Sequence, residues 1–200
     1  MDAAIGPWRP LPLEVAGRLL AGLDAPWWVA GGWAIDLFVG RQTRTHGDLD
    51  IAMRRRDQAK LRDCLDGWDL QVAADGVLSP WAEADWLEGG ARHQLWGRPS
   101  PDQPWALEIL LEESDGDDWL YRRDPAIRMG LTALGRNSLD GTPFLCPEVT
   151  LLYKSNHPEI ERNEADLAAA APMLDPAARR WLASHLAPAH PWSRRLRQPT

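Results

Sequence analysis

Two aspartates separated by a single residue are the part of the chain best suited to chemistry. Asp48 and Asp50 flank Leu49, and Ile51 follows them. Residues i and i+2 of a β-strand project to the same face, so both carboxylates would point together while the apolar neighbours enter the core. Two like charges this close repel each other, and a cation between them removes that cost. Because Mg²⁺ prefers such oxygen ligands, the pair predicts a metal site.

A glycine pair stands upstream of the aspartates. Gly31 and Gly32 follow a short apolar run at residues 27–30 and precede residues with helical spacing. Backbone N–H groups at the start of a helix with a glycine turn can donate hydrogen bonds to phosphate oxygens. The stretch as a whole therefore predicts a combined metal and phosphate site.

A third acid lies inside a later apolar run, at residues 105–111. In a strand, Leu107 and Ile109 would face away from Glu108 and leave its carboxylate isolated on one face. An ionised glutamate in such a strand is costly unless it is paired or bound to metal. It could ligate a metal, accept a proton from a hydroxyl, or do both. The competing interpretation is an acid on an edge strand that faces solvent.

Several arginines surround the aspartates in the sequence and could meet a polyphosphate. They are Arg41, Arg44, Arg54, Arg55 and Arg56. For residues 54–56 alone, a solvated arginine run is the favoured interpretation.

Composition narrows the class of protein. The 200 residues suit one compact domain, with or without a small appendage, and a hydrophobic content of 44% can supply a core. The net charge of −7 argues against a general nucleic-acid coat. A basic, then apolar, N-terminal leader is absent, and no apolar run approaches the ~18 residues of a membrane span. We therefore expect a cytoplasmic protein.

The cysteines and tryptophans are expected to be structural. Cys64 and Cys146 have no CxxC or Cys/His spacing, so we expect buried free thiols and no structural zinc. Most of the twelve tryptophans should anchor the core, and one or two could stack on a base or a sugar ring.

Hydrophobic periodicity and turn residues predict a mixed α/β part followed by helices. Predicted helices cover residues 12–23, 33–38, 57–65 with Asp57 as cap, a segment starting at Pro147, 163–174 and 176–186. Predicted strands cover residues 27–30, 49–53, 68–74, the surroundings of 95–96, and 105–111. Residues 112–119 are expected to form an acidic loop, turns are expected at 115–116 and 140–143, and the tail from Pro188, which includes Pro199, is expected to be irregular.

The glycine pair, the spacer and the Asp-x-Asp motif together resemble the nucleotidyltransferase superfamily with a DNA-polymerase-β-like core. The similarity is greatest to the aminoglycoside 2″-nucleotidyltransferase branch. It is strong over residues 25–55, weaker over 105–111, and returns at 147–154. The positions that fit this branch are Trp33, Asp36, Gly40, Arg41, Thr43, Arg44 and His46.

The resemblance implies an α/β (α+β) fold, with a small twisted mixed sheet flanked by helices and a C-terminal helical subdomain. Residues 1–145 would form the nucleotidyltransferase core and residues 146–200 the helical subdomain. It implies Mg²⁺-dependent transfer of a nucleoside monophosphate from ATP or another nucleoside triphosphate to a hydroxyl, with one or two Mg²⁺ ions and pyrophosphate as leaving group.

The resemblance also implies roles for particular residues. Asp48, Asp50 and Glu108 would be the catalytic metal ligands, although relatives usually carry aspartate at the third position. The nucleotide would be bound by Gly31, Gly32, Arg41, Arg44, His46 and Lys154.

Structural roles compete with several of these assignments. Arg44 could form a surface ion pair, and Lys154 could be a solvated helix residue. His46 could order its loop instead of contacting phosphate. For Asp36 we favour a structural role, holding the basic loop by pairing with an arginine.

The leading hypothesis is an enzyme that modifies a small hydroxylated molecule, such as an aminoglycoside or lincosamide antibiotic. The acidic stretch at 112–118 would attract a cationic acceptor. One alternative is an enzyme that modifies tRNA or a protein, and the acidic net charge disfavours RNA as its substrate. Another is a catalytically degraded nucleotide-binding regulator. Both a monomer and a homodimer are compatible with the sequence.

Overall fold

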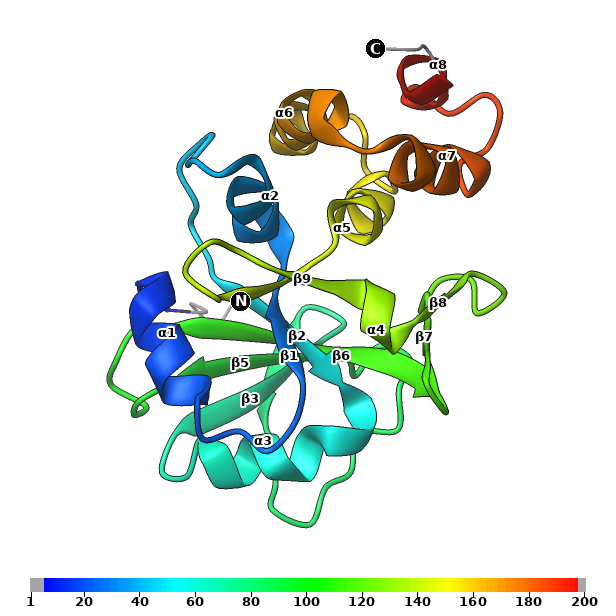
Figure 1. Cartoon of the computed structure of the whole chain (residues 1–200). Helices are drawn as coiled ribbons and strands as arrows, with labels where there is room; N and C mark the ends of the chain where they lie inside the picture. Colours follow the sequence, from blue (N-terminus) through cyan, green and yellow to red (C-terminus); the bar gives the residue numbers. More distant parts are fainter. Residues whose placement is uncertain (1–5, 198–200) are drawn as a thin grey trace.

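A mixed β-sheet forms the centre of the molecule in the computed structural model, which describes residues 6–197 (Figure 1). Its strand order is β4-β3-β5-β6-β2-β1-β10-β9, and β7 and β8 extend it from β6. The pairs β1–β10 and β2–β6 are parallel, and the other pairs are antiparallel. The mixed α/β fold predicted from the sequence is confirmed.

The strands among the described residues are β1 (Trp27–Val29), β2 (Asp50–Arg54), β3 (Asp69–Ala74), β4 (Val77–Pro80), β5 (Gln94–Arg98), β6 (Leu107–Asp115), β7 (Asp118–Leu120), β8 (Arg128–Gly130), β9 (Gly135–Asn137) and β10 (Pro143–Leu145). The α-helices are α1 (Leu13–Leu20), α2 (Gly31–Val39), α3 (Gln58–Cys64), α4 (Leu131–Leu134), α5 (Pro147–Lys154), α6 (Glu161–Ala170), α7 (Pro176–Ser184) and α8 (Ser193–Arg197). Short 3-10 turns precede α3 and follow α6.

The two faces of the sheet bury different helices. Ile51 and Met53 of β2 join a core with α1 and α3. Ala52, which points the other way, joins a second core with Leu151 and Leu152 of α5. Asp50 shares the face of Ala52, so strand alternation directs its carboxylate toward the C-terminal helices.

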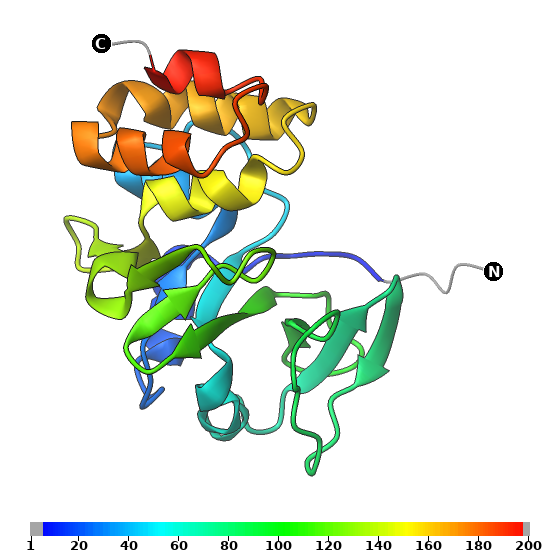
Figure 2. The ribbon, with the colours of Figure 1, turned by 90° about the vertical axis from the view of Figure 1, so that its right-hand side faces the viewer.

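The C-terminal helices gather at one end of the molecule. Figures 1 and 2 show α5 to α8 stacked together, with α2 beside α5 and α6. Pro147 stands in the first turn of α5, and the Asp175 carboxylate caps α7 by accepting hydrogen bonds from the N–H groups of Ala177 and Ala178. Both helix starts agree with the sequence prediction.

The prediction of an acidic loop at residues 112–119 is wrong. Strand β6 continues through Glu112 to Asp115, and β7 pairs with it from Asp118 onward, so the turn is confined to residues 116–117. Glu112 is buried because Trp119 and Tyr153 hydrogen-bond its carboxylate. A carboxylate that accepts such hydrogen bonds can be buried within a strand, even where its charge would predict that the strand ends.

Other local predictions also need correction. The Asp57 carboxylate does not cap α3 but accepts a hydrogen bond from Arg54. The tail is not wholly irregular, because residues 193–197 form α8 and bury Leu196, while Pro199 lies outside the described residues. Short segments without a clear period, namely β4, β8, β9, β10 and α4, were not predicted.

In the arginine run at 54–56, Arg54 and Arg55 are structural instead of solvated, whereas Arg56 is exposed, as expected. Arg55 is buried, pairs with Glu113, and donates to the carbonyls of Leu87 and Leu111. Arg54 pairs with Asp57. A phosphate role for this run is therefore not supported by its contacts.

Cysteine and tryptophan burial follows expectation except at Cys64 and Trp86. Cys146 is buried and Cys64 half-buried, and both thiols are free. Trp105, Trp119 and Trp192 are almost fully buried, whereas Trp86 is 46% exposed. None of the helices among residues 6–197 has the length and apolar character that crossing a membrane requires.

Candidate active site

Three acids converge where β2 and β6 begin. Asp50 and Glu108 are register partners on these parallel strands, and Asp48 precedes β2. One carboxylate oxygen from each lies within 4.8 Å of the other two. Leu49 and Ile51 are fully buried, so the backbone alternation that the sequence predicted brings the acids together.

The acids in this cluster oppose one another's ionisation. Burial, followed by the charges of Glu108 and Asp48, raises the pKa of Asp50 well above its usual value. Burial also raises the pKa of Glu108; a hydrogen bond from Gln94 opposes that rise, whereas the charge of Asp48 adds to it. Three adjoining carboxylates of this kind fit a hard divalent cation such as Mg²⁺, which would relieve the repulsion.

The glycine pair allows close packing against the site residues. A Cβ on Gly31 would lie 1.7 Å from the Asp50 Oδ2 atom, and its φ of +60° favours glycine. A Cβ on Gly32 would lie 2.1 Å from an Arg44 guanidinium nitrogen and 2.5 Å from His46 Nδ1. The absence of both side chains thus lets the N-terminus of α2 contact the acids and the basic loop.

The loop between α2 and β2 is held by Asp36. Its carboxylate accepts hydrogen bonds from the Thr43 backbone N–H at 2.9 Å and from the Thr43 hydroxyl at 2.5 Å. The other carboxylate oxygen lies 2.5 Å from His46 Nε2. Asp36 therefore orders the loop, as predicted, but through Thr43 and His46 instead of through an arginine.

His46 is enclosed by this arrangement. Its side chain is only 1% exposed, and its ring lies on Trp33 with 4.4 Å between the centroids. These contacts favour the loop-ordering interpretation over direct contact with phosphate.

Arg44 and Lys154 meet at a buried acid. Arg44 donates to both carboxylate oxygens of Asp166, from Nε at 2.8 Å and from a terminal nitrogen at 3.0 Å. Lys154 Nζ lies 2.8 Å from Asp166 Oδ2. We call these three residues the cation bridge. Asp166 was not identified from the sequence, because it lies 122 residues from Arg44 in an alanine-rich helix where nothing marks it.

Arg41 is placed differently from the other predicted phosphate ligands. It is exposed, and it lines a surface pocket with Trp33, Leu37 and Leu139. Among the residues that the structure describes, its guanidinium forms no ion pair.

A cavity of about 230 Å³ adjoins the acid cluster. Gly31, Lys154 and Arg162 line it together with Tyr153 and Glu112. Lys154 and Arg162 also lower the pKa of Asp50 through their charge, which opposes the effect of burial and the neighbouring acids. Arg162 is a further residue of the site region that sequence reasoning did not assign, whereas Glu112 was expected in an acidic loop and instead lines this cavity.

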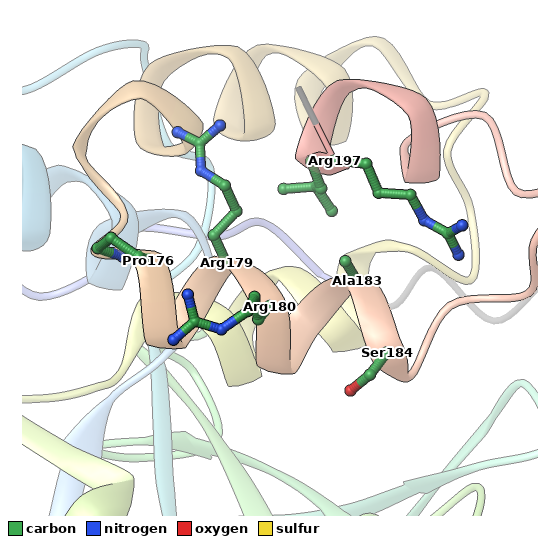
Figure 3. A pocket seen from close by; sticks show the side chains of 7 residues that line it. Pro176, Arg179, Arg180, Ala183, Ser184 and Arg197 are labelled. Carbon is green, nitrogen blue, oxygen red and sulfur yellow. The ribbon is translucent and has the colours of Figure 1, made fainter. Parts of the chain in front are cut away.

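A second cavity, of about 460 Å³, lies between α7 and α8 (Figure 3). Arg179, Arg180 and Arg197 line it, and Figure 3 shows their guanidinium groups pointing in different directions. The elements that carry the three acids contribute nothing to this cavity. It is therefore separate from the candidate site.

Comparison with known proteins agrees with the fold and with the resemblance that the sequence shows. Residues 13–80, which contain the glycine pair and Asp-x-Asp, match the aminoglycoside-2''-adenylyltransferase family model. Curated relatives named 2''-aminoglycoside nucleotidyltransferase, from Escherichia coli and Klebsiella pneumoniae, are 26% identical over 155 residues, which covers 62% of this chain and 88% of each relative.

Solved structures share the fold. ANT(2")-Ia in complex with adenylyl-2"-tobramycin superposes with a TM-score of 0.54 at 16% identity, covering 86% of this chain and 95% of that one. The lincosamide adenylyltransferase LnuA, lincomycin-bound, gives a TM-score of 0.54 at 19% identity, covering 78% and 92%.

The family model and the curated relatives are named as adenylyltransferases or nucleotidyltransferases, the class of enzyme that the sequence pattern predicted. The chain's resemblance to the aminoglycoside 2''-nucleotidyltransferase branch is confirmed by the family model and by the curated relatives.

Proposed function

We propose that this protein transfers a nucleoside monophosphate from a nucleoside triphosphate to a hydroxyl group of a small antibiotic, with Mg²⁺ as cofactor. The supporting observation is the convergence of Asp48, Asp50 and Glu108 beside the N-terminus of α2. Carboxylates that hold divalent cations, next to free helix N–H groups, are the parts that an in-line displacement at phosphorus requires.

The three acids would hold the cation and Glu108 would also handle the proton. When bound, Mg²⁺ supplies charge neutralisation for the phosphate oxygens and for the leaving pyrophosphate. Glu108 would accept the proton of the attacking hydroxyl, a task to which a carboxylate with a raised pKa is suited. Gln94 donates to Glu108 and so fixes the position of its carboxylate.

The nucleotide would lie between the α2 N-terminus and the C-terminal helices. Gly31 and Gly32 would offer backbone N–H groups to the triphosphate, as predicted from the sequence. Lys154 and Arg162 line the adjoining cavity and carry the opposite charge. In this arrangement residues 1–145 act as the core that carries the acids, and residues 146–200 as the helical subdomain that closes the nucleotide site.

The proposed acceptor is an aminoglycoside or a lincosamide. The relatives at 26% identity are named for aminoglycosides, and the two structural neighbours are described with tobramycin and lincomycin products or ligands. Both antibiotic classes carry the hydroxyl groups that the reaction needs.

The test is pyrophosphate release from ATP or GTP with Mg²⁺ and a panel of aminoglycosides and lincosamides. The matched control is the Asp48→Asn, Asp50→Asn double variant, which keeps side-chain size and removes both charges. Turnover with an antibiotic in the wild type and not in the control supports the proposal. Label transfer to tRNA or to lysate protein, or metal-dependent nucleotide binding with no turnover for any acceptor, would contradict it.

A further inference from the structure

The buried carboxylate of Asp166 joins two cations that belong to distant parts of the chain. Arg44 lies in the loop before β2, and Lys154 is the last residue of α5, whereas Asp166 lies on α6. The Asp166 side chain is 0% exposed, but those of Arg44 and Lys154 keep 20% and 13% of their surface. The anion is thus enclosed while both cations retain an open side.

The electrostatics of the cation bridge favour a charged Asp166. Burial alone would raise the pKa of Asp166, but hydrogen bonds and charges from Arg44 and Lys154 outweigh it and lower that pKa. One negative charge therefore stands against two positive charges, so the group carries an excess positive charge in a protein whose net charge is −7.

Both cations keep hydrogen-bond donors that the bridge does not use. A guanidinium has five N–H groups and an ammonium has three. Arg44 uses three of its donors, two on Asp166 and one on the Thr45 carbonyl, and Lys154 uses one on Asp166. With respect to residues 6–197, each cation therefore has two N–H groups left for a further ligand.

Both cations lie near the start of α2. An Arg44 terminal nitrogen occupies the space where Gly32 would carry a Cβ, and Lys154 lines the same cavity as Gly31. Asp48 contributes to the raised pKa of Arg44, after the larger effect of Asp166, and Lys154 is among the charges that act on Asp50. The cations that contact Asp166 are therefore also close enough to the acid cluster to interact with its charges.

We propose that Asp166 is a positioning residue for the triphosphate: it holds Arg44 and Lys154 against the N-terminus of α2, with their remaining donors directed at the phosphate oxygens. This inference rests on the proposed nucleotide site and adds a residue that does not touch the nucleotide. A pre-positioned pair of cations lowers the entropic cost of binding, because two long side chains are already ordered.

An alternative is that Asp166 ties α6 to the loop and contributes nothing to nucleotide binding. The two roles differ in what they predict for nucleotides of different phosphate length. Positioned cations would favour ATP over AMP, because AMP lacks the phosphates that they contact. A purely structural tie would affect ATP and AMP alike.

The experiment measures the dissociation constants of ATP and AMP by calorimetry, with Mg²⁺ and without acceptor, for wild type, Asp166→Asn and Asp166→Glu. Asp166→Asn should weaken ATP binding about tenfold or more, the size of one lost charge-assisted hydrogen bond, and AMP binding less than about threefold. Asp166→Glu keeps the charge and should recover part of the preference for ATP.

Glu161→Gln is the matched control. It removes one carboxylate from the same helix, and Glu161 is exposed and forms no hydrogen bond to either cation. Its preference for ATP over AMP should stay within about twofold of the wild-type value. Circular dichroism melting establishes that each variant is folded at the assay temperature. If Asp166→Asn does not fold, Asp166→Glu provides the same comparison, with a smaller loss of preference expected.

The outcomes separate the two proposals. Wild-type protein that binds no nucleotide would overturn the proposed function. Wild type that prefers ATP, together with folded Asp166 variants that keep this preference or bind ATP more tightly, would overturn only the positioning role. Equal weakening of ATP and AMP would assign Asp166 to structure alone.

Discussion

The acid cluster and the cation bridge differ in how their charges are arranged: the cluster brings like charges together, and the bridge pairs opposite charges. In the cluster, two parallel strands bring Asp48, Asp50 and Glu108 together, and burial, with the neighbouring negative charges, raises the pKa values of Asp50 and Glu108. In the bridge, a buried Asp166 is matched by Arg44 and Lys154, and its pKa falls.

The difference is in what compensates the buried charge: protein side chains in the cation bridge, and a bound cation in the acid cluster. The bridge is already satisfied by protein groups, so it can form before any ligand binds and hold its cations in place. The acids lack such cations in direct contact and store unfavourable energy that a bound cation would release. Substitution of aspartate by asparagine should therefore have opposite effects on stability in the two places.

The largest effect is expected from Glu108→Gln. The amide keeps the size of the side chain but cannot accept a proton, so turnover should fall by about 10²- to 10⁴-fold. Pyrophosphate release at saturating ATP and acceptor measures it. Because a slightly shorter acid keeps both possible roles, Glu108→Asp should retain much more activity. Turnover of the Gln variant within threefold of wild type would remove Glu108 from the mechanism.

Asp166→Asn should destabilise the protein by about 3 kcal/mol. Removing one partner of a buried ion pair leaves uncompensated charge, and here two cations lose their anion. Urea unfolding followed by tryptophan fluorescence gives the free energy of unfolding. Glu161→Gln, at an exposed position of the same helix, serves as the reference and should change that energy by less than about 0.5 kcal/mol. A similarly small change for Asp166→Asn would show that the cation bridge contributes little to the stability of the folded protein.

Gly31→Ala should cost about 2 kcal/mol. The positive φ of Gly31 is unfavourable for alanine, and the added methyl would overlap the Asp50 carboxylate. Gly22→Ala is the control, because no atom lies within 4 Å of the Cβ that it would add. Equal unfolding midpoints for the two variants would contradict the close contact between α2 and the acids.

Asp50→Asn should change the free energy of unfolding in the opposite direction. It should stabilise the metal-free protein by about 1–2 kcal/mol at pH 7. A carboxyl with a raised pKa in the folded state destabilises folding once the pH exceeds its pKa in the unfolded chain, about 4. The advantage of the variant should therefore shrink as the pH falls toward 4. Unfolding curves in EDTA across this range measure it.

Added Mg²⁺ provides the second half of this comparison. It should raise the melting temperature of wild type and have little effect on Asp50→Asn, because ligands that bind only the folded state stabilise it. A variant that is less stable than wild type in EDTA would show that the cluster is not under electrostatic strain.

Local sequence patterns were sufficient to predict much of the arrangement of the acid cluster. Alternation along β2 places Asp48 and Asp50 together and buries Leu49 and Ile51, and this depends only on backbone geometry. Pro147 and Asp175 mark helix starts through equally local effects. In residues 112–119 the same reasoning failed, because Glu112 is kept in its strand by a tyrosine 41 residues away.

The sequence by itself determined the α/β fold and the placement of the two aspartates, because both are encoded in short spacings that the backbone converts directly into geometry. Tertiary structure alone decided the register that sets Glu108 beside Asp50, and the meeting of Arg44 and Lys154 at Asp166. Those contacts join residues that lie between 12 and 122 positions apart. Their energies depend on burial and on the partner's charge, neither of which is a property of the local sequence.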